Sequence, residues 1–218
     1  MTSSIDCLLF DLDGTLADTA PDLAHALNLT LAHFGRQPLP FEKIRPVVSH
    51  GGIALIRRGF DIQPEDEGFE ERRLYLLDVY LQNICRHTRL FPGMEQVLDT
   101  LRKKDIPWGI VTNKPAWLTD PLMDALPMPY STEVIISGDT CEHNKPHPQP
   151  LLCASERLKT PPPRCLYVGD AQRDIEAGKA AGMATACALF GYIQEQDHPE
   201  DWQADFTLEQ PQDLLALL

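Results

Sequence analysis

The chain has 218 residues, enough to bury a hydrophobic core as one large domain or as one domain with a smaller insertion. Its 19 basic and 32 acidic side chains give a formal charge of −13, which argues against a broad nucleic-acid-binding surface or an electrostatic membrane anchor. Such a charge repels anionic ligands, so a site for one needs local positive charge, for example from a metal ion and a lysine.

An apolar run over residues 5–10 ends at Asp11-Leu12-Asp13-Gly14-Thr15, which predicts a buried strand that leads into a loop. Between residues 16 and 89 the pattern is helical, and no strand pattern interrupts it. One apolar stripe consists of Leu23, Ala26, Leu27, Leu31 and Phe34, and a second of Leu74, Leu77, Val79, Leu81 and Ile84. We predict a helical lobe over residues 16–90, with Phe91-Pro92-Gly93 as the hinge that leads back to the main domain.

From residue 92 onward, strand and helix patterns alternate. The predicted strands are Trp108–Thr112, Val134–Ser137, Cys165–Gly169 and Met183–Cys187, and the predicted helices are Met94–Lys104, Leu151–Leu158 and Asp174–Ala181. This alternation predicts an α/β fold, a parallel sheet with helices on both faces that binds ligands at the carboxyl ends of its strands. Asp11, Thr112 and Asp170 all fall at such ends.

Two carboxylates, Asp11 and Asp13, follow the first predicted strand. Side chains two residues apart in an extended segment point to the same side, so both can act on one ligand. Asp11 can attack phosphorus, while Asp13 protonates the leaving oxygen and then removes a proton from the hydrolytic water. Gly14 permits a sharp turn that brings backbone N–H groups close to a phosphate. For this segment alone, an Asp-Gly turn with two solvated acids is the other interpretation.

A second acidic pair, Asp170 and Asp174, lies at the end of a later strand and one helical turn beyond it. Phosphoryl transfer to a carboxylate needs a divalent cation, and Mg²⁺ prefers one or two carboxylates plus waters. We expect Asp170 to bind the metal directly, and Asp174 to be a further ligand or a group that orients the site. Without the Asp11 segment, an N-cap acid followed by a solvated helix acid would be the better interpretation.

Three further residues have polar groups that suit a phosphoryl site. The Thr112 hydroxyl and the neighbouring amides at Asn113 can hold phosphoryl oxygens. Lys145 can offset the negative charge on Asp11 and on the transferring group. Each is an ordinary turn residue or solvated lysine when taken singly, so these assignments depend on the acidic segments.

In order along the chain, these segments resemble the four motifs of phosphatases of the haloacid dehalogenase superfamily. Asp11–Thr15 resembles the nucleophile motif, Thr112 the second, Lys145 with Pro146 the third, and Gly169–Asp174 the fourth. The resemblance implies a Rossmann-like core and Mg²⁺ held by Asp11, the carbonyl of Asp13 and Asp170, with an aspartyl-phosphate intermediate. It also implies that residues 1–15 and 91–218 form the core domain, with residues 16–90 as a helical cap domain.

Within that superfamily, Asp18–Leu23 and Val111–Pro115 resemble the phosphoglycolate phosphatase group. Ser49–Gly52 lies where that group carries a glycine-containing substrate loop, so we expect His50 and Gly51 to contact substrate together with Asn113. An exposed histidine in a helix N-terminal turn is an equally good interpretation of His50. Phe190–Ile193 and the residues after it resemble the N-acetylmuramic acid 6-phosphate phosphatases of cell-wall recycling. The expected substrate is 2-phosphoglycolate, with N-acetylmuramic acid 6-phosphate as the alternative.

The same residues also bear on the other reactions that such a scaffold can catalyse. A dehalogenase has no use for Asp13, and a phosphonate hydrolase needs a Schiff-base lysine, for which the helical lobe offers only Lys43. A sugar phosphomutase retains every motif and remains open. The intact acids argue against a catalytically silent binding module.

The remaining features concern the compartment and partners. None of the six cysteines forms a C-x-x-C pair and several lie in apolar runs, which is typical of reduced core thiols. No apolar stretch approaches the roughly 18 residues that span a bilayer, and the first residues do not resemble a leader peptide. We therefore expect a cytoplasmic monomer or homodimer that binds a small phosphorylated molecule and neither nucleic acid nor membrane.

Overall fold

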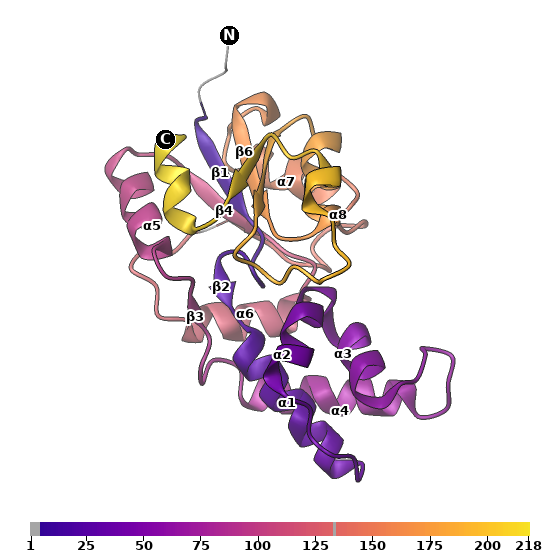
Figure 1. Cartoon of the computed structure of the whole chain (residues 1–218). Coiled ribbons are helices and arrows are strands. Elements are labelled where there is room, and N and C mark those ends of the chain that lie inside the picture. The colour runs from indigo at the N-terminus through magenta and orange to yellow at the C-terminus, as the bar shows by residue number, and fades with distance from the viewer. Residues whose placement is uncertain (1–4, 133) are drawn as a thin grey trace.

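The computed structural model describes residues 5–132 and 134–218, and its main body is built on one six-stranded sheet (Figure 1). In spatial order the strands are β5 (Ile135–Ile136), β4 (Trp108–Val111), β1 (Cys7–Phe10), β6 (Cys165–Gly169), β7 (Ala184–Ala188) and β8 (Phe206–Leu208). All neighbouring strands run parallel, so their carboxyl ends lie at the same edge of the sheet. The predicted α/β fold class is confirmed.

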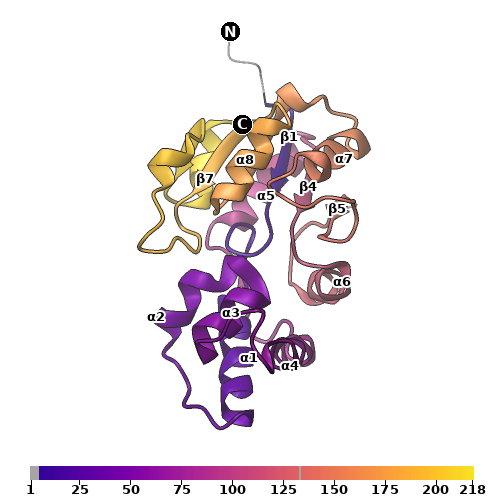
Figure 2. The ribbon, with the colours of Figure 1, turned by 90° about the vertical axis from the view of Figure 1, so that its right-hand side faces the viewer.

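Helices cover both faces of this sheet (Figure 2). One face carries α5 (Met94–Lys103), α6 (Ala116–Ala125) and the short 3-10 helix η4 (Pro211–Ala216), and the other carries α7 (Gln149–Arg157) and α8 (Gln172–Ala180). Strand β1 is buried on both sides: Leu8 and Phe10 pack with α5, while Cys7 and Leu9 pack with α7 and α8. None of the helices in the described part of the chain is both long and apolar enough to cross a membrane.

A second, helical body lies at the carboxyl edge of the sheet, away from the C-terminus (Figure 1). It consists of α1 (Ala20–His33), α2 (Phe41–Ile44), η1 (Arg45–His50), α3 (Gly51–Phe60) and α4 (Phe69–Gln82), which share a hydrophobic cluster of their own. Leu23, Ala26, Leu27 and Leu31 are buried as the first predicted stripe requires.

The second predicted stripe was wrong at Leu74, which is 55% exposed, and it left out Leu76 and Tyr80, which are buried. Its other members are confirmed, since Val79 is buried and Leu77, Leu81 and Ile84 are partly buried against the helical cluster. The reason is that α1 and α3 pack against the face of α4 that carries Leu76 and Tyr80. Apolar residues lie on adjacent faces of this helix, so periodicity alone did not show which face would be covered.

Two strands of two residues each, β2 (Ala17–Asp18) and β3 (Arg89–Leu90), pair antiparallel where the chain passes between the two bodies. The prediction that no strand interrupts residues 16–89 was therefore wrong, and β8 was also missed. Strands of two or three residues are too short to show an alternating pattern. The pairing holds the outgoing and returning segments side by side (Figure 1).

Asp22, a fully buried carboxylate in the first turn of α1, ties these crossing segments together. It accepts hydrogen bonds from the backbone N–H of His87 at 3.0 Å, and from the N–H and hydroxyl of Thr88 at 2.9 and 2.8 Å. The start of the helical body is thus bonded to the segment that leads into β3.

We expect Asp22→Asn to lower the free energy of unfolding by about 2–3 kcal/mol, because the new amide places a donor against backbone donors. Urea denaturation followed by circular dichroism measures this as a lower midpoint. Asp78→Asn on the exposed side of α4 is the matched control and should shift stability by less than about 0.5 kcal/mol. Equal midpoints for the two variants would contradict the structural role of Asp22.

Candidate active site

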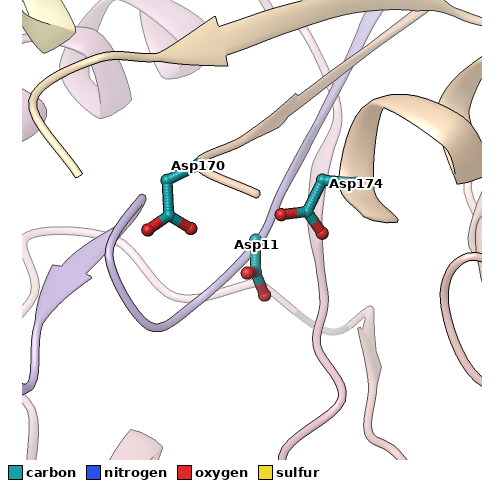
Figure 3. Close-up of side chains that lie close together, drawn as sticks. All are labelled: Asp11, Asp170 and Asp174. Carbon is teal, nitrogen blue, oxygen red and sulfur yellow. The ribbon is translucent and has the colours of Figure 1, made fainter. Parts of the chain in front are cut away.

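Three buried carboxylates gather at the carboxyl edge of the sheet, where their side chains lie close together (Figure 3). Asp11 follows β1, Asp170 follows β6, and Asp174 lies in the first turn of α8. One oxygen from each lies within 4.8 Å of the others, and at most 3% of each residue is exposed. Hard oxygen donors at this spacing suit a divalent cation. The cluster predicted from widely separated segments is therefore present in the fold.

Lys145 provides the positive charge closest to these acids. Its Nζ lies 2.9 Å from Asp11 Oδ1 and 2.8 Å from Asp174 Oδ1. The same ammonium donates to the carbonyl of Val111 at 2.9 Å and to the hydroxyl of Tyr167 at 2.7 Å. The Arg173 guanidinium also acts on these acids, but two positive charges do not balance three buried carboxylates, so the site has a deficit of positive charge that a metal ion would fill.

The pKa values of the acids also reflect this shortage of positive charge. Burial raises the pKa of Asp11 above its ordinary value, although Lys145 opposes this. Burial and the neighbouring carboxylates raise the pKa of Asp170 to about 7. Burial would also raise the pKa of Asp174, but Lys145 and Arg173 outweigh it and hold that pKa below its ordinary value. Negative charge at Asp11 and Asp170 is thus costly in the metal-free protein.

Asp13 pairs with Lys114 instead of joining the three clustered acids. Lys114 Nζ lies 2.8 and 3.1 Å from the two oxygens of Asp13, and the hydroxyl of Thr19 donates to Oδ1 at 2.6 Å. Burial lowers the pKa of Lys114, but Asp13 raises it more, so the ammonium stays charged. Lys114 was not predicted as a site residue, although it lies two residues after Thr112 and within the Val111–Pro115 segment that carries the resemblance.

The turn after Asp11 closes directly on Asp170. Gly14 has φ +87°, and a β-carbon there would lie 2.2 Å from Asp170 Oδ2, so only glycine fits. The hydroxyl of Thr15 lies 3.4 Å from Asp170 Oδ1, and the N–H of Tyr192 donates to Oδ2 at 2.9 Å. The loop and Asp170 are consequently held in one arrangement.

Thr112 and Asn113 follow β4, as expected. The Thr112 hydroxyl accepts a hydrogen bond from the N–H of Lys114 at 3.2 Å. Both ends of the Asn113 amide bond the backbone of Lys145, at 3.1 Å to its N–H and 2.9 Å to its carbonyl. Asn113 thus positions the lysine loop, and its contact with a substrate stays a prediction.

The predicted substrate loop of the helical body touches the acids directly. The Ser49 hydroxyl donates to Asp170 Oδ2 at 2.7 Å, and the Arg173 guanidinium donates to the Ser49 carbonyl at 2.7 Å. Arg173 also lies 3.3 Å from His50 Nδ1, and burial together with this guanidinium lowers the pKa of His50. Ser49 and Arg173 were not singled out from the sequence, although Arg173 lies between Asp170 and Asp174.

A cavity of about 420 Å³ lies between the helical body and the sheet edge. Of the predicted site residues, those that line it are Asp11, Asp13, His50, Gly51, Thr112 and Asn113. Lys145 and Asp174 are buried, and Asp170 borders a neighbouring cavity. The fold thus brings the predicted residues to one region.

The sequence matches a family model described as haloacid dehalogenase-like hydrolase over residues 8–188. It is 39% identical to an N-acetylmuramic acid 6-phosphate phosphatase of Pseudomonas putida, over 97% of this chain and 95% of that protein. It is 43% identical to a phosphoglycolate phosphatase of Xylella fastidiosa, over 94% of this chain and 89% of that protein.

The fold is also similar to that of solved structures of such phosphatases. A crystal structure from Haemophilus somnus, described as a predicted phosphoglycolate phosphatase, has a TM-score of 0.86 at 25% identity and covers 98% of this chain and 97% of its own. The family match spans the strands and loops that carry Asp11, Thr112, Lys145 and Asp170. With this fold and this buried acidic cluster, the chain belongs to the haloacid dehalogenase-like hydrolases.

Proposed function

We propose that this protein is a Mg²⁺-dependent phosphatase that hydrolyses a carboxylated phosphomonoester through an aspartyl-phosphate at Asp11. The observation that carries this proposal is the position of Asp11, which lies at a cavity beside Asp13 and is bonded to Lys145 within an acidic cluster. The names of the relatives support the reaction, since both act on small phosphorylated molecules that also carry a carboxylate. Their two substrates, 2-phosphoglycolate and N-acetylmuramic acid 6-phosphate, are the candidates.

We assign the metal to Asp11, Asp170 and the backbone carbonyl of Asp13. When bound, Mg²⁺ offsets the charge of the acids and of the phosphoryl group, which allows two anions to meet. Both oxygens of Asp174 accept short hydrogen bonds, Oδ1 from Lys145 at 2.8 Å and Oδ2 from the N–H of Ala171 at 3.0 Å, whereas Oδ1 of Asp170 has only a longer contact of 3.4 Å with the hydroxyl of Thr15 among the described residues. Asp174 therefore has the role of orienting Lys145.

The remaining steps follow from the positions of the side chains. A carboxylate oxygen of Asp11 forms a bond to phosphorus as the ester oxygen leaves. Asp13, which must first take up a proton and give up its ion pair with Lys114, gives that proton to the leaving oxygen. Asp13 then takes a proton from the water that attacks the aspartyl-phosphate, which releases phosphate and regenerates Asp11. Lys145 and Thr112 stabilise the charge on the phosphoryl oxygens.

We further propose that residues 16–90 act as a cap over a core of residues 1–15 and 91–218. The separate hydrophobic cluster of the helical body and the paired crossing segments support this division. With the cap in place, water is excluded while His50 and Gly51 contribute to the substrate cavity. All six cysteines are free thiols, which supports a cytoplasmic location.

We expect Asp11→Asn to lower phosphate release by at least about a thousandfold, since an amide does not form the covalent intermediate. The assay follows free phosphate from both candidate esters, and circular dichroism checks the fold. Asp120→Asn, on the exposed side of α6, is the control and should retain the wild-type rate. An active Asp11→Asn enzyme would remove the nucleophile assignment. Transfer between hexose phosphates without phosphate release would indicate a mutase instead, and ligand binding without turnover a binding module.

The raised pKa of Asp170 gives a pH-dependent prediction for the metal-free protein. Because the folded state holds this proton more tightly than the unfolded state does, the residue's contribution to stability falls as pH rises from about 4 to about 7. Mg²⁺ at about 100 times its Kd should then add about 2.7 kcal/mol at pH 8, a rise in Tm of roughly 5–10 °C, and less at pH 5. Thermal melts of wild type and Asp170→Asn measure this. Equal Mg²⁺ shifts in the two proteins would contradict the metal assignment.

A further inference from the structure

One face of helix α4 forms a wall of the substrate cavity. Arg73, Leu77 and Tyr80 all line it, and their spacing of four and three residues places them on the same side of the helix. This face offers, in order along the helix, a guanidinium, an apolar side chain and a phenol. Neither Arg73 nor Tyr80 has a part in the phosphoryl-transfer steps.

The hydroxyl of Tyr80 is buried and makes no hydrogen bond with any residue that the structure describes. Lys114 Nζ lies 4.8 Å from the centre of the same ring, so Tyr80 lies beside the Lys114–Asp13 pair. Burial raises the pKa of Tyr80 to about 12, which leaves the hydroxyl protonated as a donor at neutral pH. The Lys114 ammonium can only donate to this hydroxyl, so the hydroxyl proton still lacks an acceptor, and a ligand oxygen would supply one.

Arg73 differs from the other cations that line the cavity. Lys114 is paired with Asp13, and Arg173 is bonded to the loop at Ser49. The ion pair of Arg73 is with Glu70 on the same helix, at 2.6 and 2.7 Å, and Glu70 is largely exposed. Glu70 uses the Nε–H and one N–H of Nη2, so the N–H groups on the Nη1–Nη2 edge of the guanidinium remain to bind a ligand carboxylate in a bidentate geometry.

The helix also places this cation away from Tyr80 and from the Lys114–Asp13 pair beside it. Tyr80 and Arg73 are seven residues apart on α4, which corresponds to roughly 10 Å along the axis at ~1.5 Å per residue. The pair with Glu70 draws the guanidinium further from Tyr80, toward the start of the helix. In 2-phosphoglycolate three bonds separate phosphorus from the carboxyl carbon, a reach of only about 3.8 Å. A sugar ring between the two groups bridges the longer distance.

We propose that Arg73 is a specificity-determining residue that binds the carboxylate of a phosphorylated sugar acid, while Tyr80 donates a hydrogen bond to an oxygen of the sugar. The inference rests on the proposed phosphatase function and narrows its substrate to esters with a ring between phosphate and carboxylate. The cavity volume of about 420 Å³ agrees, since it exceeds what a two-carbon ester fills and lies within the range of roughly 300–1,000 Å³ for larger ligands.

The test compares kcat/KM for N-acetylmuramic acid 6-phosphate and N-acetylglucosamine 6-phosphate, which is the same sugar without the carboxylate-bearing ether. Wild type should favour the carboxylated ester at least tenfold, and Arg73→Gln should lower that ratio by about 10–100-fold, chiefly through KM. Arg73→Lys should restore part of it, because it keeps the charge but not the planar fork. Arg58→Gln removes an exposed cation of α3 outside this cavity and should keep the wild-type ratio.

The Tyr80→Phe variant distinguishes a hydrogen bond to the sugar from a purely structural role of the hydroxyl. Loss of a hydroxyl that has no protein partner should leave Tm unchanged or raise it. The same variant should lower kcat/KM for both sugar phosphates by about fivefold and leave their ratio unchanged. A lower Tm with unchanged kinetics would overturn the role of Tyr80 in binding the sugar.

The outcomes also separate this inference from the proposed function. A wild-type enzyme that prefers 2-phosphoglycolate, or that hydrolyses both sugar phosphates equally, would overturn the role of Arg73 while the phosphatase assignment stands. An Arg73→Gln enzyme that keeps the wild-type ratio would do the same. No phosphate release from any of the three esters would overturn both.

Discussion

The contact of the Lys145 ammonium with Asp11 and Asp174 is the interaction on which the site depends. It is completely buried and joins segments that follow three different strands: Asp11 after β1, the lysine loop after β5, and Asp174 after β6. Tyr167 and Val111 complete its hydrogen bonds. Removing this charge would leave like-charged carboxylates facing one another at low dielectric, so the parallel sheet and the lysine are needed together.

The overall charge of −13 and an anionic substrate are compatible because charge is distributed locally. Lys114 and Arg173 border the same cavity as Asp11 and Asp13, and Arg73 adds a cation from the helical body. The acids are partly neutralised where phosphate would enter. The remaining deficit of positive charge lies at Asp170, where a cation is expected.

The position of the helical body is coupled to these acids through the segment after β7. Tyr192 donates its N–H to Asp170, and its hydroxyl bonds Asp18 and the N–H of Ala20 at the start of α1. Arg45 of the helical body donates to the carbonyls of Phe190 and Gly191. A residue that orients a proposed metal ligand therefore also anchors the body that closes the cavity.

By itself, the sequence determined the α/β class, the helical insertion and the cluster formed by Asp11, Asp170, Asp174 and Lys145, because strand ends and polar motifs are local features that parallel pairing brings to one edge. Tertiary structure alone decided that Asp13 pairs with Lys114, that the Asn113 amide holds the lysine loop, and that α4 presents Arg73 and Tyr80 to the cavity. The physical reason is that a sequence pattern is local. Periodicity shows which residues are apolar, whereas the partner of a charged group and the covered face of a helix depend on segments that are distant in the chain.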